Sequence, residues 1–144
     1  MRHLRGMWAR RSGGIEVRGG FWLVLGLMVL LFPLRFLAGA MLAAAVHELG
    51  HLAAIWLTGG RIQRIELNAW GARIAADPME PGRELICALA GPGFGAVTIL
   101  AWRAYPELAA AGLVQTVFNL LPLPPLDGGR AIRAALVLFS GDGP

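Results

Sequence analysis

Apolar residues fill four long runs of this chain, and polar residues gather between the runs. The runs cover residues 21–34, 36–58, 84–101 and 108–121. A helix of about 20 apolar residues spans the roughly 30 Å hydrocarbon core of a bilayer. Two of the runs reach about that length and the other two are shorter. The pattern predicts a mainly α-helical membrane protein, a bundle of about four transmembrane helices.

The stretch between the second and third runs has a different period. In residues 61–76, apolar and polar side chains alternate, which is typical of a strand with two unlike faces. The alternating residues are Arg64, Ile65, Glu66, Leu67, Asn68 and Ala69. A turn near residues 68–71 followed by a returning strand would make a small β-hairpin insertion in the bundle.

The fourth run ends in a segment that cannot continue as a helix. Three prolines lie between residues 122 and 125, and helical character resumes only over 130–139. A helix broken at membrane depth is tolerated only where protein or a water-filled cavity surrounds it. The sequence therefore predicts irregular backbone next to a polar site, with one of the helices broken.

The first 19 residues are rich in arginine and glycine, and we interpret them as a basic cytoplasmic tail. Residues 20–144 then form a single domain. A cleaved signal peptide is the competing interpretation of the first apolar run, and it would leave a small secreted protein. We favour a membrane helix because the basic lead is long and because the remaining apolar runs would have to fold in water.

Composition and charge agree with a membrane protein whose partner is the lipid bilayer. The hydrophobic fraction is 56% and the charged fraction 15%, against about 25% charged residues in soluble domains. The net charge is +4, but the arginines lie between apolar runs and form no dense patch with aromatics, so we expect no nucleic acid partner. Only Arg35 and Arg103 lie in the two predicted outer turns. The positive-inside rule then places both termini and the hairpin in the cytoplasm.

The second apolar run contains the pattern H-E-x-x-H at residues 47–51. His47 and His51 lie on one face of a helix and can bind one zinc ion, and Glu48 can take a proton from an activated water. The alternative is a pair of hydrogen-bonded histidines in a helix bundle. We favour the metal site because three ionisable groups within a membrane span are costly without a function.

A catalytic zinc ion has three protein ligands and one open position. Asp127 is the best candidate for the third ligand because it follows the broken segment and is the only acid between Glu107 and Asp142. We therefore expect one Zn²⁺ per chain. Asn119 lies one turn before the break. Its amide could either stabilise the oxyanion of a reacting peptide or bond backbone groups freed by the prolines, and the sequence leaves both roles open.

These motifs together resemble the site-2 proteases, intramembrane zinc metalloproteases of the M50 peptidase class. The matching patterns are H-E-x-x-H at 47–51, A-G-P at 90–92, N-x-x-P at 119–122 and L-D-G at 126–128. The resemblance implies His47, His51 and Asp127 as ligands and Glu48 as the catalytic base. Many members have asparagine where this chain has Gly95, so one polar contact is missing here.

The resemblance also implies a function. The chain is expected to hydrolyse membrane-anchored protein substrates within or near the bilayer of a bacterial cytoplasmic membrane, with its active site open to the cytoplasm. The layout is most similar to the sporulation branch, which processes a sigma-factor precursor, and it has no room for a PDZ or nucleotide-binding domain. Because three or four short spans make a small bundle, a regulatory membrane partner is also expected.

The hairpin of such proteases lies near the active site, which predicts substrate-binding residues here: Ile65, Leu67, Asn68 and Gly71. The alternative function is a catalytically inactive zinc-binding membrane protein or a transporter-like component. Against it, the chain has no second related half, and a transporter has no use for a glutamate at position 48.

Overall fold

A computed structural model describes residues 14–69 and 71–140 of the chain. These residues form five α-helices, one 3₁₀ helix and one three-stranded sheet. The helices are α1 (Gly19–Leu31), α2 (Leu34–Leu57), α3 (Pro81–Val97), η1 (Thr98–Ala101), α4 (Pro106–Asn119) and α5 (Asp127–Ser140), and the strands are β1 (Gly14–Val17), β2 (Ile62–Asn68) and β3 (Gly71–Ala76). The predicted mainly helical fold with a small sheet is thus confirmed. Residues 1–13 of the predicted tail lie outside the described residues.

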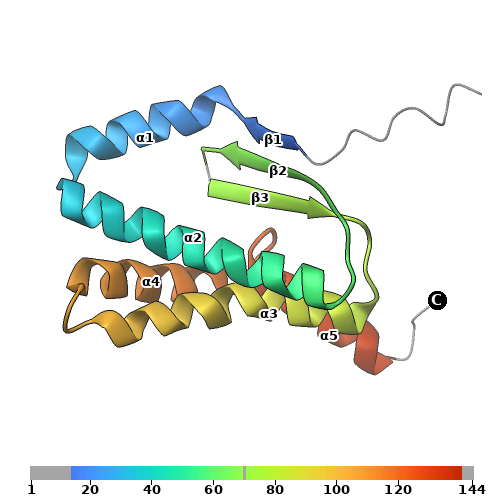
Figure 1. The fold of residues 1–144 in the computed structure, drawn as a ribbon. Helices are drawn as coiled ribbons and strands as arrows, with labels where there is room; N and C mark the ends of the chain where they lie inside the picture. Colours follow the sequence, from blue (N-terminus) through green and yellow to red (C-terminus); the bar gives the residue numbers. More distant parts are fainter. Residues whose placement is uncertain (1–13, 70, 141–144) are drawn as a thin grey trace, which may run out of the picture.

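Helix α2 lies at the centre of the molecule. The sheet and α1 lie on one side of it, α3 and α4 pack on the other side, and α5 packs against α3 (Figure 1). Glycines let these helices approach closely: a Cβ atom at Gly50 would lie 2.5 Å from the carbonyl oxygen of Ala90. A Cβ at Gly39 would lie 2.8 Å from the backbone of Leu108. Small residues at helix contacts are the usual device of membrane bundles.

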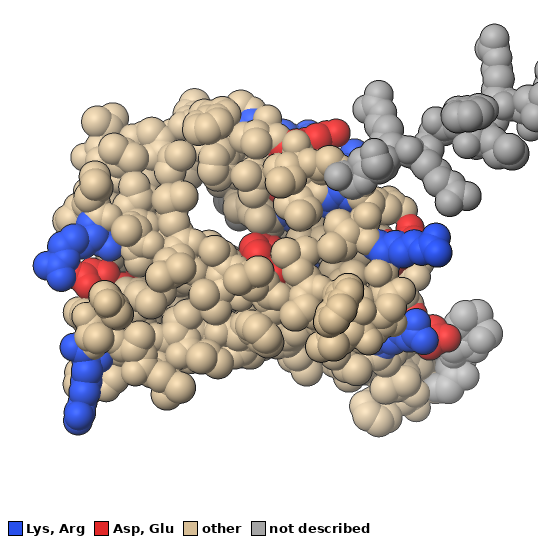
Figure 2. Space-filling model, in the orientation of Figure 1, with Lys and Arg blue, Asp and Glu red and all other residues tan. Residues whose placement is uncertain are grey.

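Burial is inverted relative to a soluble domain. The buried apolar residues are mostly alanines, and the large apolar side chains face outward on every helix. The strongly exposed ones include Trp22, Leu30, Trp56, Leu100, Val114 and Phe139. In Figure 2, charged side chains gather mainly at the two ends of the view, and between them the visible charged atoms are mainly acidic ones at a hollow. Large apolar side chains exposed on every helix indicate a lipid-facing exterior.

Among the described residues, two helical segments are long and apolar enough to cross a membrane. They are α2, with 24 residues, and the continuous segment Pro81–Ala101, with 21 residues. Helix α1 is also apolar but has 13 residues, and α4 and α5 have 14 each. The predicted count of about four transmembrane helices therefore stays a prediction.

The predicted hairpin is present as the antiparallel pair β2–β3, which turns between Asn68 and Gly71. Gly71 has a φ of 113°, a backbone conformation that favours glycine. Strand β1 was not predicted. It pairs in parallel with β2, with Gly14 opposite Arg64 and Val17 opposite Leu67. Consequently β2 is the central strand, and β1 and β3 form the two edges.

The predicted helix break lies between α4 and α5, but the second helix resumes earlier than predicted. Helix α5 begins at Asp127 and not at Arg130. Glycines allow this because the preceding loop folds back onto the first turn of α5. A Cβ at Gly128 would overlap the carbonyl group of Leu120, and one at Gly129 would lie 2.6 Å from the carbonyl carbon of Leu123. The fold-back carries Asp127 into the bundle, where it is buried.

Candidate metal centre

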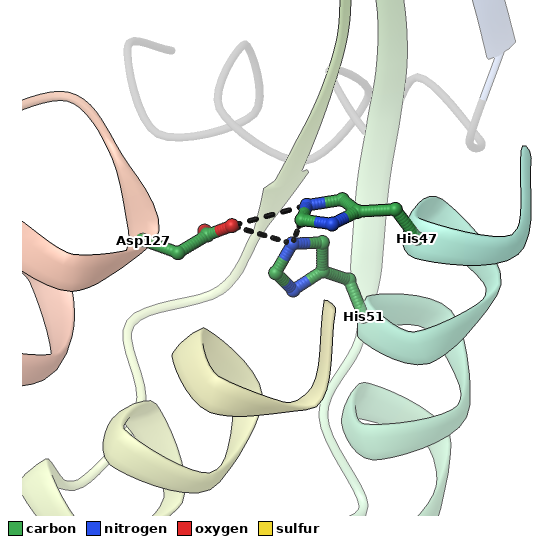
Figure 3. Close-up of side chains that lie close together, drawn as sticks. All are labelled: His47, His51 and Asp127. Carbon is green, nitrogen blue, oxygen red and sulfur yellow. Dashed lines mark hydrogen bonds and ion pairs between the residues drawn. The ribbon is translucent and has the colours of Figure 1, made fainter. Parts of the chain in front are cut away.

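Three predicted ligand atoms meet between α2 and α5 (Figure 3). Nε2 of His47, Nε2 of His51 and Oδ2 of Asp127 each lie 3.1 Å from the other two. The imidazoles stand one turn apart on α2, and the carboxylate reaches them from the first residue of α5. The exposed fractions of these residues are only 2%, 7% and 6%. The fold therefore joins residues 80 positions apart in a buried triangle of donor atoms.

The triangle has the size that a zinc ion requires. Tetrahedral bonds of about 2.0–2.1 Å place neighbouring ligand atoms about 3.3 Å apart, close to the 3.1 Å seen here. The hydrogen on Nδ1 of His51 is donated to the Cys87 carbonyl oxygen at 2.8 Å. A neutral His51 then points the lone pair of Nε2 at a carboxylate oxygen, an arrangement that is repulsive unless a cation lies between them. Two imidazoles and one carboxylate are a typical zinc donor set.

Helix α3 packs directly against the two imidazoles at Gly91. A Cβ atom at Gly91 would lie 2.5 Å from Cε1 of His51 and 2.8 Å from Nε2 of His47. Only a residue without a side chain lets the α3 backbone cover both rings. The same helix supplies the Cys87 carbonyl that holds His51, and this contact fixes the tautomer whose Nε2 is free to bind a metal.

The second imidazole lacks such a contact. Within the described part of the chain, Nδ1 of His47 has no hydrogen-bond partner, and neither does the Thr116 hydroxyl. A Cβ at Gly95 would lie 2.9 Å from that hydroxyl and 3.5 Å from Nδ1. The Cβ atom of an asparagine at this position would therefore lie close to both the Thr116 hydroxyl and Nδ1 of His47. The glycine therefore leaves the orientation of His47 to packing and, when a metal ion is bound, to that ion.

The remaining predicted residues supply none of the three atoms of the triangle. Glu48 is half-buried on α2 beside the two histidines. The Asn119 amide donates to the Gln115 carbonyl oxygen of its own helix at 3.0 Å, which is a backbone-satisfying contact. Ile65, Leu67, Asn68 and Gly71 belong to the hairpin, which lies with α1 on one side of α2 in Figure 1. A hollow lies in the face shown in Figure 2, with acidic atoms at its edge.

Three contributors to this centre were not predicted from the sequence. The Cys87 carbonyl is a backbone group, which no side-chain motif can indicate. Arg130 donates to Oδ1 of Asp127 at 3.1 Å, and its spacing of three residues from Asp127 on a helix was a usable signal. Glu84, which pairs with Arg130 at 2.9 Å, lies 46 positions away and carried no signal.

Fold and centre together define a class: a helical protein with an apolar exterior and a buried centre suited to one metal ion. No protein-family model matches the chain. The chain is 32% identical over 130 residues to a zinc metalloprotease of Methanocaldococcus jannaschii, covering 81% of this chain and 35% of the relative. It is 28% identical over 142 residues to stage IV sporulation protein FB of Bacillus subtilis, covering 88% and 48%.

A solved structure agrees with these relatives. The site-2 protease from Methanocaldococcus jannaschii matches with a TM-score of 0.71 and 26% identity, over 85% of this chain and 67% of that one. The predicted resemblance is confirmed: the homologues of this chain are zinc metalloproteases and site-2 proteases, among them a sporulation protein. The chain spans about a third to a half of the length of these two curated relatives, 35% and 48%.

Proposed function

We propose that this chain is an intramembrane zinc metalloprotease that hydrolyses peptide bonds of membrane-anchored proteins within or near the bilayer. The observation that carries the proposal is the triangle of His47, His51 and Asp127, built on a helix long enough to span a membrane. Its zinc-type donor set and its buried position suit hydrolysis in a site shielded from bulk water. The similarity to zinc metalloproteases supports the same activity.

Each nearby residue has a distinct part in this reaction. When bound, zinc supplies a Lewis acid that makes water more acidic and a peptide carbonyl more electrophilic. Glu48 accepts a proton from the attacking water and returns it to the leaving amine nitrogen. The Cys87 carbonyl keeps His51 in the ligating tautomer. Asn119 is a less suitable oxyanion donor, because its amide is bonded to the Gln115 carbonyl oxygen.

We further propose a multi-pass topology with about four membrane segments, one of them broken, and with both termini and the hairpin facing the cytoplasm. Arg35, in the first turn of α2, and Arg103, in the turn between η1 and α4, lie at the same end of the bundle (Figure 1). Arg61, Arg73 and Arg83 lie in and beside the hairpin. This asymmetry supports the orientation by the positive-inside rule. The similarity to a Bacillus sporulation protein supports a bacterial cytoplasmic membrane and, as a candidate substrate, a sigma-factor precursor.

The sheet restricts how an extended substrate could be held. Strand β2 is paired on both sides, so the backbones of Ile65 and Leu67 cannot pair with a further strand. Strand β3 is an edge strand, and in Figure 1 it lies between β2 and the central helix α2. We propose that a locally unfolded substrate adds to the β3 edge, a common mode of peptide recognition. The predicted binding role then shifts from β2 toward β3.

Proline substitutions test the β3 edge. Successive N–H groups of a strand point to opposite edges. One of the two variants Ala72→Pro and Arg73→Pro therefore removes a donor that faces β2, and the other removes a donor that faces the unpaired edge of β3. We expect one of these variants to keep the melting temperature of the wild type but to lose about tenfold or more in cleavage rate, since a ladder hydrogen bond to the substrate is missing. Wild-type cleavage by the stable variant would contradict substrate pairing at this edge.

Metal removal tests the proposed activity itself. The purified chain in lipid vesicles, mixed with a model membrane-anchored substrate, should lose cleavage on treatment with a zinc chelator and regain it when zinc is restored. The Asp127→Ala variant should not regain it, because one of three ligands is gone. Zinc binding by the wild type without any cleavage of membrane-anchored substrates would favour an inactive zinc-binding or transporter-like protein instead.

A further inference from the structure

The carboxylate of Asp127 is divided between two sets of contacts. Its Oδ2 atom faces both imidazoles, and its Oδ1 atom accepts a hydrogen bond from Nη1 of Arg130 at 3.1 Å. The other edge of the same guanidinium faces Oε1 of Glu84: Nε donates a hydrogen bond to it at 3.0 Å, and Nη2 forms an ion pair with it at 2.9 Å. A continuous polar chain therefore runs from Glu84 in the first turn of α3 to the metal centre.

Arginine suits this position because its planar fork can hold two carboxylates at fixed angles. Arg130 stands three residues after Asp127 on α5, so both side chains lie on the same face of the helix. Glu84 comes from a different helix and sets the direction of the guanidinium. A lysine has one ammonium group and cannot hold both partners in the same geometry.

Exposure separates a positioning role from a purely stabilising one. The side chains of Arg130 and Glu84 are 34% and 30% exposed, whereas that of Asp127 is 8% exposed. Exposed ion pairs contribute little to the free energy of unfolding. Holding the orientation of a buried ligand is a different matter, because changing groups that orient metal ligands typically lowers metal affinity about 10- to 100-fold.

We propose that Arg130 and Glu84 are positioning residues that fix Asp127 through Oδ1, so that Oδ2 alone is presented to the metal. This inference rests on the proposed zinc centre. Arg130 supplies the directional hydrogen bond, and Glu84 aligns Arg130 and balances its charge, so that the guanidinium does not draw the carboxylate away from the ion. Zinc affinity thus depends on a glutamate that lies outside the ligand set.

Competition for zinc against a chelator, with the full chain purified in detergent, tests this. We expect Arg130→Gln to bind zinc about 10- to 100-fold more weakly and Arg130→Lys to remain weaker than the wild type. Glu84→Gln should also bind more weakly, and the double variant should be no worse than Arg130→Gln, because Glu84 acts through Arg130. The matched control is Arg133→Gln, an exposed arginine on the same helix, which should leave affinity unchanged.

The melting temperature of the metal-free protein distinguishes positioning from stability. It should change little in these variants, while the rise in melting temperature on adding zinc should shrink. Removing a positive charge near a cation would by itself tighten binding, so unchanged or tighter zinc binding by Arg130→Gln overturns the proposal. So does an additive loss in the double variant.

Three further outcomes also have a defined meaning. If Arg130→Gln does not fold, Glu84→Gln tests the same series of contacts and leaves the hydrogen bond from Arg130 to Asp127 in place. If the wild type itself holds no zinc, the proposed function fails together with this inference. Wild-type zinc binding with unaffected variants removes the inference alone.

Discussion

Replacing Glu48 by glutamine is expected to lower the rate of substrate cleavage by about 10²- to 10⁴-fold while zinc remains bound. Glutamine has nearly the same shape but cannot accept the proton of the attacking water. Glu48 supplies none of the three atoms of the buried triangle, so the ligand set is intact in the variant. The measurement is the initial cleavage rate of a membrane-anchored substrate beside the zinc content of the same sample.

A matched substitution controls for the loss of a carboxylate elsewhere. Glu107 is partly exposed and pairs with Arg35 at 3.6 Å, at the end of the bundle away from the hairpin. Glu107→Gln should cleave at close to the wild-type rate. Full activity in Glu48→Gln would show that the proposed base is wrong. Loss of zinc together with activity would show that Glu48 maintains the centre and is not its base.

The second large effect is expected from adding a single methyl group to α3. Gly91→Ala would place a Cβ atom 2.5 Å from Cε1 of His51 and 2.8 Å from Nε2 of His47, so that the helix or the rings must move. Overpacking of this kind costs about 1–3 kcal/mol. Because the strain falls on the ligand rings, we expect zinc affinity to fall by about 10- to 100-fold. Chelator competition measures this directly.

The control lies two residues further along the same helix. A Cβ atom at Gly93 would meet nothing within 4 Å, so Gly93→Ala makes the same chemical change without the clash. It should bind zinc as the wild type does. Equal zinc affinities of the two alanine variants would mean that α3 does not cover the imidazoles as described.

Much of what could be predicted came from residue patterns within single segments of the chain. The spacing of His47 and His51 is a property of one helix, and the alternation in residues 61–76 is a property of one hairpin, so each needs only its own segment. Asp127 was identified from different information: a lone acid after a helix-breaking segment. The meeting of this carboxylate with the imidazoles spans 80 positions, and only the structure shows it.

What could not be predicted depends on contacts between distant segments. Strand β1 has only four residues, and its parallel partner β2 lies about 50 positions later, so no local alternation marks it. The early start of α5 depends on how Gly128 and Gly129 accommodate the preceding loop. Glu84 gains its role only through Arg130 of another helix. Strand β1 also covers one edge of β2, so that β1 and β3 are the edge strands, which the hairpin pattern alone could not reveal.

The central claim is that two imidazoles from α2 and one carboxylate from α5 hold a single zinc ion. X-ray absorption spectroscopy of the zinc-loaded protein tests this most directly. The account predicts nitrogen and oxygen ligands at about 2.0–2.1 Å, outer-shell scattering from two imidazoles and no sulfur. A sulfur ligand at about 2.3 Å, which could come from Cys87 or a methionine, or scattering from fewer than two imidazoles, would contradict it.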